Sequence, residues 1–177
     1  QTKHSVPAAI INQTNLIRRP VTPFDNGIEY TMVNCQKVLP ILSDLIKVAK
    51  DSPERYADFW KEHGRIFKLG YMDFSNAEKY QQLLRFNSSV SKDEKELVSL
   101  EDYVGRMKKD QKEIYYSLGT SKEAIDLNPH LEIFKAKGLE VLYLYDPVDE
   151  FVVSSIRKHK DFDFKSVDGV DLKELDK

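Results

Sequence analysis

The chain has 177 residues, of which 41% are hydrophobic and 32% are charged, a composition typical of a soluble globular protein. Its 27 basic and 29 acidic side chains give a formal net charge of -2, which argues against nucleic-acid binding and against a polybasic membrane anchor. The one cysteine, Cys35, excludes an intrachain disulfide and fits a reducing compartment. No apolar run approaches the roughly 18 residues that span a bilayer.

Residues 1–36 show no sustained apolar period. Four helix breakers interrupt them, namely Pro7, Pro20, Pro23 and Gly27. We therefore expect an irregular or strand-like stretch with no clear assignment. Because the chain begins at Gln1 and ends in a charged tail, residues 170–177, we also expect it to be a piece of a larger protein.

Residues 37–110 are predicted to form a helical subdomain. Apolar residues from Val38 to Ala49 recur at three- and four-residue spacing, which predicts a helix that begins near Pro40. Ser52 followed by a proline is a typical helix start, and Gly64 is predicted to end that second helix.

Two capping boxes predict further helices in the same subdomain. They are Ser75 with Glu78, and Ser99 with Asp102. The stretch 87–96 between them is polar and charged, so it is predicted to be a solvated loop.

Residues 111–169 alternate between strand-like and helix-like patterns. Strands are predicted at 114–118, 141–145 and 162–167, and the segments between them carry caps and first-turn prolines. Such alternation predicts a short parallel sheet with right-handed crossovers. The expected fold class is therefore α/β, with a helical subdomain followed by a small three-layer α/β/α subdomain.

A parallel sheet raises the possibility of nucleotide binding at the carboxyl ends of its strands. The turn after the first strand is Gly119-Thr120-Ser121, and the chain contains no glycine-rich phosphate-binding motif. A single glycine supplies few backbone N–H groups for a phosphate, so this residue pattern disfavours nucleotide binding.

Other reactive constellations are also weak. Cys35 could act as a nucleophile with His63, His130 or His159, but a lone cysteine among capping and surface histidines is the better interpretation. The four histidines, which include His4, lack the spacing of metal ligands. Four tyrosines in the predicted strands are expected to be core aromatics more than a stacking platform: Tyr115, Tyr116, Tyr143 and Tyr145.

Three carboxylates lie around the start of the last helix. Capping and the helix dipole explain Asp146 and Asp149. Glu150 is followed at once by Phe151, and this pair is either surface acid plus core ring or a contact point for a partner. From the residues alone, the chain is a two-part α/β protein, interpreted as a binding module. The alternatives are a small α/β adaptor and a nucleotide-binding enzyme domain.

Several collinear blocks resemble the middle segment of the heat-shock protein 90 family. They cover roughly residues 41–170 and read LLRF at 83–86, VSLEDYVGRMK at 98–108, QKEIYY at 111–116, GLEV at 138–141 and PVDEF at 147–151. The residues in these blocks are more similar to the bacterial and organellar branch of the family than to the eukaryotic cytosolic branch.

The resemblance implies an ATP-driven homodimeric chaperone of the cytoplasm, or alternatively of an organelle, that binds client proteins and co-chaperones but no nucleic acid or membrane. ATP with magnesium would bind in an N-terminal domain, so no cofactor, metal or catalytic residue is expected here. The resemblance also implies a client-binding role for Glu150, Phe151 and Ser154. Bacterial members have Trp where this chain has Phe151, and Asn where it has Ser154.

One family feature is missing from the sequence. Members complete ATP hydrolysis with an arginine in a Ser-Arg-Glu motif upstream of the first long helix, and residues 1–40 contain no such motif. Arg18 and Arg19 lack its context, so neither is assigned that role.

Overall fold

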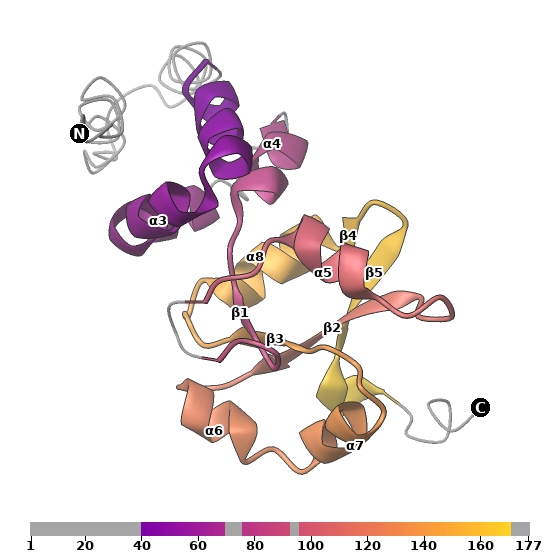
Figure 1. Ribbon diagram of the computed structural model, residues 1–177. Coiled ribbons are helices and arrows are strands. Elements are labelled where there is room, and N and C mark those ends of the chain that lie inside the picture. The colour runs from indigo at the N-terminus through magenta and orange to yellow at the C-terminus, as the bar shows by residue number, and fades with distance from the viewer. Residues whose placement is uncertain (1–39, 70–75, 93–95, 171–177) are drawn as a thin grey trace, which may run out of the picture. The chain divides into compact units, whose positions relative to one another are not determined.

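The computed structural model describes residues 40–69, 76–92 and 96–170 (Figure 1). The chain divides into two compact units between Leu83 and Leu84, whereas the sequence suggested a division near residue 110. The predictions for residues 1–36, for Cys35, for Ser75 as a cap and for the tail beyond residue 170 lie outside the described residues.

The first unit consists of helices. Residues 40–51 are helical, so Pro40 lies within the helix that the apolar stripe predicted, and its residues Leu42 and Leu45 are fully buried. Helix α3 (Pro53–Lys68) and helix α4 (Ala77–Leu83) follow. The hydroxyl of Tyr56 donates a hydrogen bond of 2.7 Å to the Leu83 carbonyl, which ties α3 to the end of α4.

The prediction that Gly64 ends the second helix is wrong. Helix α3 continues to Lys68, and Gly64 is needed for close packing instead of termination. A Cβ at this position would lie 2.5 Å from two atoms of the Trp60 indole, which is itself buried. The glycine therefore makes room for the ring one turn earlier in the same helix.

The second unit is built on a five-stranded sheet with the order β1-β3-β2-β5-β4. Its three central strands are β3 (Leu142–Leu144), β2 (Glu113–Leu118) and β5 (Phe162–Ser166). They run parallel to one another, as predicted. The two edge strands were not predicted: β1 (Asn87–Ser88) pairs antiparallel with β3, and β4 (Lys158–His159) pairs antiparallel with β5.

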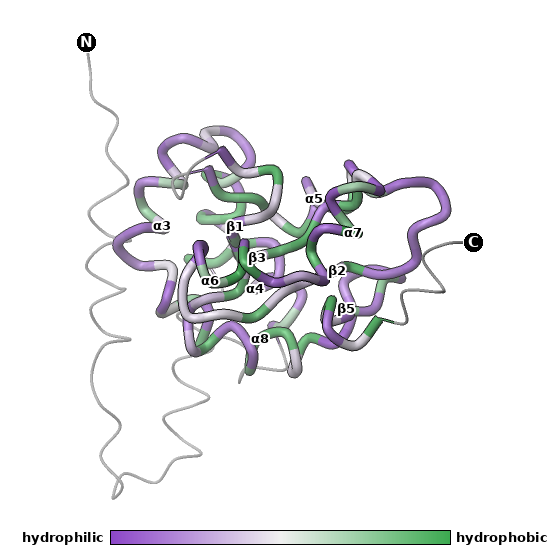
Figure 2. Tube along the Cα trace, turned by 90° about the horizontal axis from the view of Figure 1, so that it is seen from below, coloured by the Kyte–Doolittle hydropathy of each residue, from purple (hydrophilic) through white to green (hydrophobic). Residues whose placement is uncertain are grey.

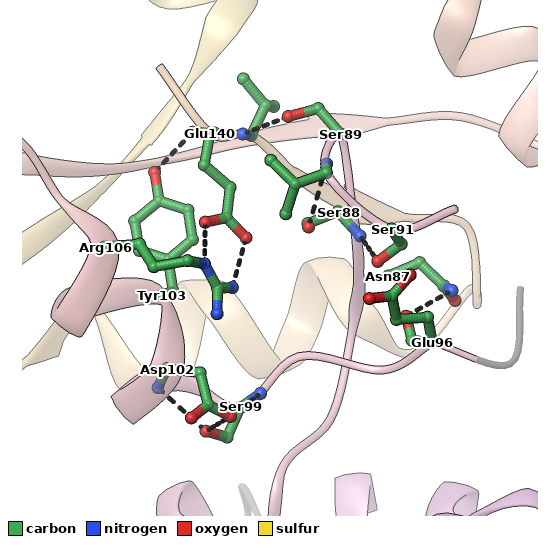
Figure 3. Close-up of polar contacts among 12 residues, drawn as sticks. Asn87, Ser88, Ser89, Ser91, Glu96, Ser99, Asp102, Tyr103, Arg106 and Glu140 are labelled. Atoms are coloured by element: carbon green, nitrogen blue, oxygen red, sulfur yellow. Dashed lines mark hydrogen bonds and ion pairs between the residues drawn. The ribbon is translucent and has the colours of Figure 1, made fainter. Parts of the chain in front are cut away.

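The prediction of a solvated loop from residue 87 is wrong for its first part. Asn87, Ser88 and Ser91 are buried, Ser88 completely. Polar groups in this stretch are bound within the protein: the Ser91 hydroxyl accepts from the Ser88 amide at 3.1 Å, and the neighbouring Ser89 hydroxyl accepts from the Val141 amide at 3.0 Å (Figure 3). Polarity therefore did not indicate exposure here.

Helices cover both faces of the sheet, which confirms the predicted three layers (Figure 1). Helices α5 (Leu100–Arg106) and α8 (Asp149–Ile156) lie on one face. Helices α6 (Lys122–Asp126) and α7 (His130–Ala136) lie on the other. A short 3-10 helix, η3 (Val167–Gly169), follows β5. Figure 2 shows hydrophobic residues along the central strands and hydrophilic residues along many of the loops that connect the elements.

The core between the sheet and helices α6 and α7 is aromatic. The rings of Tyr115 and Phe134 meet edge to face, with centroids 4.8 Å apart. Tyr143 is 2% exposed in the same cluster, beside Ile125 and Val141. The prediction that Tyr115 and Tyr143 are core aromatics is therefore confirmed, whereas Tyr116 and Tyr145 are only half-buried.

Serine side chains cap the starts of helices α5 and α6. The Ser99 capping box of α5 is present, with the Ser99 hydroxyl accepting from the Asp102 amide at 3.0 Å and the Asp102 carboxylate accepting from the Ser99 amide at 3.3 Å. In α6 the cap is Ser121, which accepts from the Ala124 amide at 3.2 Å. The sequence pattern of Thr120 with Glu123 three residues later predicts a cap one residue too early.

Candidate functional site

Helix α8 begins with a turn that its own carboxylates organise. The Asp146 carboxylate accepts from the Val148 amide at 3.2 Å, and the Asp149 carboxylate accepts from the Asp146 amide at 3.2 Å. Asp146 was predicted as the cap, but the helix starts at Asp149 with Val148 at the cap position and no side-chain cap bond. Both acids thus hold the turn before the helix, and Asp149 is buried in doing so.

The two sides of α8 have opposite character. Val152 and Val153 are buried, at 0% and 3% exposure, whereas Glu150, Phe151 and Ser154 are exposed. Because successive residues turn by about 100° around a helix, positions 150, 151 and 154 fall within one sector. The structure therefore brings the three predicted site residues together on the outer side of α8.

Phe151 is the most unusual of these residues. Its side chain is 59% exposed in the first turn of a helix whose neighbouring valines are buried. This exposure excludes the interpretation in which the Phe151 ring belongs to the core. A contiguous exposed apolar patch, more than a single ring, marks a contact site, so the neighbours of Phe151 matter.

The carboxyl end of β2 lies beside this part of α8. Strand alternation places Tyr116 and Leu118 on the face that α8 covers, opposite the Tyr115 core. Burial raises the pKa of Tyr116, and the nearby negative charges of Glu150 and Asp168 raise it further. Tyr116 therefore lies within electrostatic reach of both carboxylates.

Sequence reasoning did not include Tyr116, Leu118 or Asp168 in the candidate site. Tyr116 is half-buried and Leu118 is 37% exposed. The β-branched and aromatic residues of 114–118 predicted a strand, and nothing in that pattern marked its last residues as partly open. The signal that could have found them is position, since they end a central strand where the crossover helix begins.

The turn after β2 has a packing role. The Gly119 amide donates to the Leu144 carbonyl at 3.1 Å. A Cβ at Gly119 would lie 2.5 Å from Cγ1 of Ile125, so the glycine admits the core side chain of α6. Packing against Ile125 thus explains why residue 119 is a glycine, and no bound phosphate is needed to explain it.

The histidines proposed as partners for Cys35 lie on different elements. His63 is on α3, where its ring packs against Phe59 with centroids 4.9 Å apart. His130 on α7 is 3.4 Å from the Val167 carbonyl through Nδ1, and His159 on β4 is 3.9 Å from the Glu101 carboxylate. Within the described ranges, no group of three or more His, Cys, Asp or Glu side chains is placed to hold a metal ion.

No helix among residues 40–69, 76–92 and 96–170 combines the length and the hydropathy needed to cross a membrane.

A polar network joins α5 to the segment before β3. Tyr103 and Arg106 of α5 both bind Glu140 (Figure 3).

Comparison with known proteins identifies the family. The family model described as Hsp90 protein matches residues 31–177. The chain belongs to the Hsp90 family. This confirms the resemblance that the sequence blocks carried.

The curated relatives of this Hsp90 family chain include bacterial proteins named Chaperone protein HtpG. It is 49% identical to that of Nitratidesulfovibrio vulgaris over 76% of the chain and 21% of the relative. It is 43% identical to that of Chromobacterium violaceum over 90% of the chain and 25% of the relative. The chain thus spans about a fifth to a quarter of the length of these relatives, and their bacterial origin agrees with the predicted branch.

A solved structure extends the likeness to the fold. The middle domain of a Plasmodium falciparum heat shock protein superposes with a TM-score of 0.72 at 30% identity, covering 82% of this chain and 61% of that one. The predicted helical part followed by an α/β/α part is therefore the Hsp90 middle-domain fold. The roles of Glu150, Phe151 and Ser154 stay a prediction.

Proposed function

We propose that this chain serves as the client-binding middle segment of an ATP-dependent Hsp90 chaperone. The HtpG relatives are named as chaperones, and the structural match is to a middle domain. In this proposal ATP and magnesium bind in an N-terminal domain, and the middle segment couples client binding to that ATPase domain. The whole protein acts as a homodimer in the cytoplasm, with client proteins and co-chaperones as partners.

The exposed ring of Phe151 is the observation that supports the client-binding role most directly. It lies on helix α8 with Glu150 before it and Ser154 three residues later, and all three are open to solvent. A ring presented with a carboxylate and a hydroxyl offers apolar contact and hydrogen bonding together. Such a surface suits weak contact with many partly folded chains, because it needs no matching shape.

A binding titration with an unfolded probe tests this proposal. Reduced and carboxymethylated α-lactalbumin, labelled with a fluorophore, is titrated with the chain, and anisotropy reports the Kd. We expect Glu150→Lys with Phe151→Ala to weaken binding by roughly tenfold, the usual scale for removing one aromatic anchor from a small interface.

Leu127→Ala provides the matched control. Leu127 is 82% exposed and follows α6 on the opposite face of the sheet, so the control also removes an exposed apolar side chain. We expect it to leave the Kd unchanged. If the α8 double variant binds the probe as tightly as the parent chain, the surface assignment is wrong.

A further inference from the structure

Three segments around the carboxyl ends of the central strands contain no cation, although Lys122, Arg157 and Lys165 directly adjoin them along the chain. Residues 141–156, which form β3, the following turn and α8, contain three acids and no Lys, Arg or His. The acids are Asp146, Asp149 and Glu150. The residues that end β5 and form η3, 166–170, add Asp168 and again no cation. The end of β2 and its turn, 114–121, are uncharged.

Two of these carboxylates reach the surface. Glu150 and Asp168 are both exposed. Glu150 makes no ion pair within the described part of the chain, and the Asp168 carboxylate accepts one hydrogen bond, of 3.0 Å, from the amide of Asn128. Among the residues that the structure describes, neither carboxylate forms an ion pair with a cation.

Apolar surface continues from Phe151 toward the sheet. Leu118 ends β2 on the side that α8 covers, where it pairs in register with Leu144. It is 37% exposed, and Tyr116 two residues earlier is half-buried on the same face. The outer side of α8 and the carboxyl end of β2 together form a partly apolar surface bordered by acids, here called the α8–β2 surface.

We infer that the α8–β2 surface selects client segments in which apolar residues are flanked by Lys or Arg. This inference rests on the client-binding role proposed above and names the chemistry of the preferred segment. Apolar side chains contact Phe151 and Leu118, and the flanking cations meet Glu150 and Asp168. Unpaired surface acids attract a cationic segment and repel an acidic one, so charge decides which exposed apolar segments bind.

Three labelled peptides of equal length and identical apolar centre test the inference, with flanks of lysine, serine or glutamate. Binding to the full 177-residue chain is followed by anisotropy. At low salt we expect the lysine-flanked peptide to bind about three- to tenfold more tightly than the serine-flanked one, and the glutamate-flanked peptide to bind most weakly. Raising NaCl from about 0.05 to about 0.5 M should largely remove the difference, because these charges are exposed.

The double variant Glu150→Gln with Asp168→Asn assigns the effect to this surface. Asn at position 168 keeps an oxygen for the Asn128 amide, so only charge is removed. We expect the lysine preference to disappear while binding of the serine-flanked peptide is retained. The matched control is Glu132→Gln with Asp110→Asn, which removes the same charge from exposed positions on α7 and before β2. It should keep most of the preference.

The possible outcomes distinguish the charge selection from the client-binding role on which it rests. If Phe151→Ala weakens all three peptides but they bind the parent chain equally, the client-binding role stands and the charge selection is wrong. If Phe151→Ala changes none of them, the client-binding role itself fails. A lysine preference that survives the double variant overturns the assignment to Glu150 and Asp168. If the chain self-associates and Phe151→Ala abolishes that self-association, a second copy of the chain occupies the α8–β2 surface. That result would also overturn the inference.

Discussion

Arg106 and Glu140 join two segments of the chain through a pair of parallel hydrogen bonds. The Arg106 Nε donates to one carboxylate oxygen at 2.9 Å and Nη2 donates to the other at 2.8 Å, across 34 positions of sequence (Figure 3). The Glu140 side chain is 9% exposed, whereas that of Arg106 is 45% exposed. The pair therefore fastens the end of α5 to the segment that leads into β3.

Removal of the guanidinium should destabilise the second unit. Arg106→Ala leaves the Glu140 carboxylate partly buried without its main partner, and we expect a loss of about 1–2 kcal/mol, limited by the exposure of the arginine. Arg106→Lys keeps the charge but loses the two-point geometry, so it should cost about half as much. Urea unfolding followed by circular dichroism measures both.

The pair of Lys61 and Asp58 on α3 is the control for Arg106. Its N–O distance is 2.9 Å, but both side chains are well exposed. Lys61→Ala should change stability by no more than about 0.5 kcal/mol. An equal loss for Arg106→Ala and Lys61→Ala would show that the two-point geometry and the burial of Glu140 contribute little.

Tyr103 is the second fastening point in the same network. Its buried hydroxyl donates to the Glu140 carbonyl at 2.7 Å and accepts from the Tyr115 amide at 2.9 Å and from the Gln111 side chain at 3.1 Å. Tyr103→Phe would leave a buried N–H and a carbonyl without partners, so we expect a loss of about 2–3 kcal/mol in urea unfolding.

Tyr116→Phe is the matched control for Tyr103→Phe. The Tyr116 hydroxyl makes no hydrogen bond to any residue that the structure describes, and the ring is half-buried on the neighbouring position of the same strand as Tyr115. We expect its removal to change stability by less than about 0.5 kcal/mol. A similar cost for the two tyrosines would contradict the role assigned to the Tyr103 network.

The central part of this fold could be predicted because its signals are long or repeated. The stripe from Pro40 to Ala49 spans several turns. The three parallel strands are apolar or alternating runs separated by helix caps. Strand β1 has only two residues, Asn87 and Ser88, so it has no period to recognise. Its pairing with β3 depends on a partner more than fifty residues away, which no local pattern encodes.

The candidate site, like the fold, could be predicted only in part from the sequence. An acid followed by a ring on a first helical turn, as in Glu150–Phe151, fits both a core ring and a contact ring. Which of the two occurs depends on how α8 is rotated against the sheet, and the burial of Val152 and Val153 fixes that rotation. Position at the end of a central strand could have pointed to Leu118, but its exposure could not be predicted, since it depends on where α8 ends its cover of β2.

His159 should make stability depend on pH in the acidic range. It is buried at the sheet edge, and burial lowers its pKa below 6.5, with Lys160 also lowering it and Glu101 opposing. The neutral ring is thus favoured by the fold. Its contribution is fully present above the unfolded-state pKa near 6.5 and is lost as pH falls through the lower folded-state pKa.

Urea unfolding from about pH 7.5 to about pH 5 would measure this contribution, whose slope cannot exceed about 1.4 kcal/mol per pH unit for one proton. His159→Gln removes the titrating ring while keeping a polar side chain. We expect the variant to lose less stability on acidification than the parent chain. Parallel pH profiles for the two proteins would show that another group causes the acid sensitivity.

Two helical glycines should respond in opposite directions to the same substitution. At Gly64 a methyl group would lie 2.5 Å from the buried Trp60 indole, so Gly64→Ala should destabilise the first unit by about 1–2 kcal/mol as the ring is displaced. At Gly105 no atom lies within 4 Å of an added Cβ. Gly105→Ala should therefore stabilise α5 by about 0.5–1 kcal/mol, because alanine loses less backbone entropy on folding. Urea unfolding of both variants checks the signs, and stabilisation by Gly64→Ala would mean that the Trp60 ring moves aside at little cost.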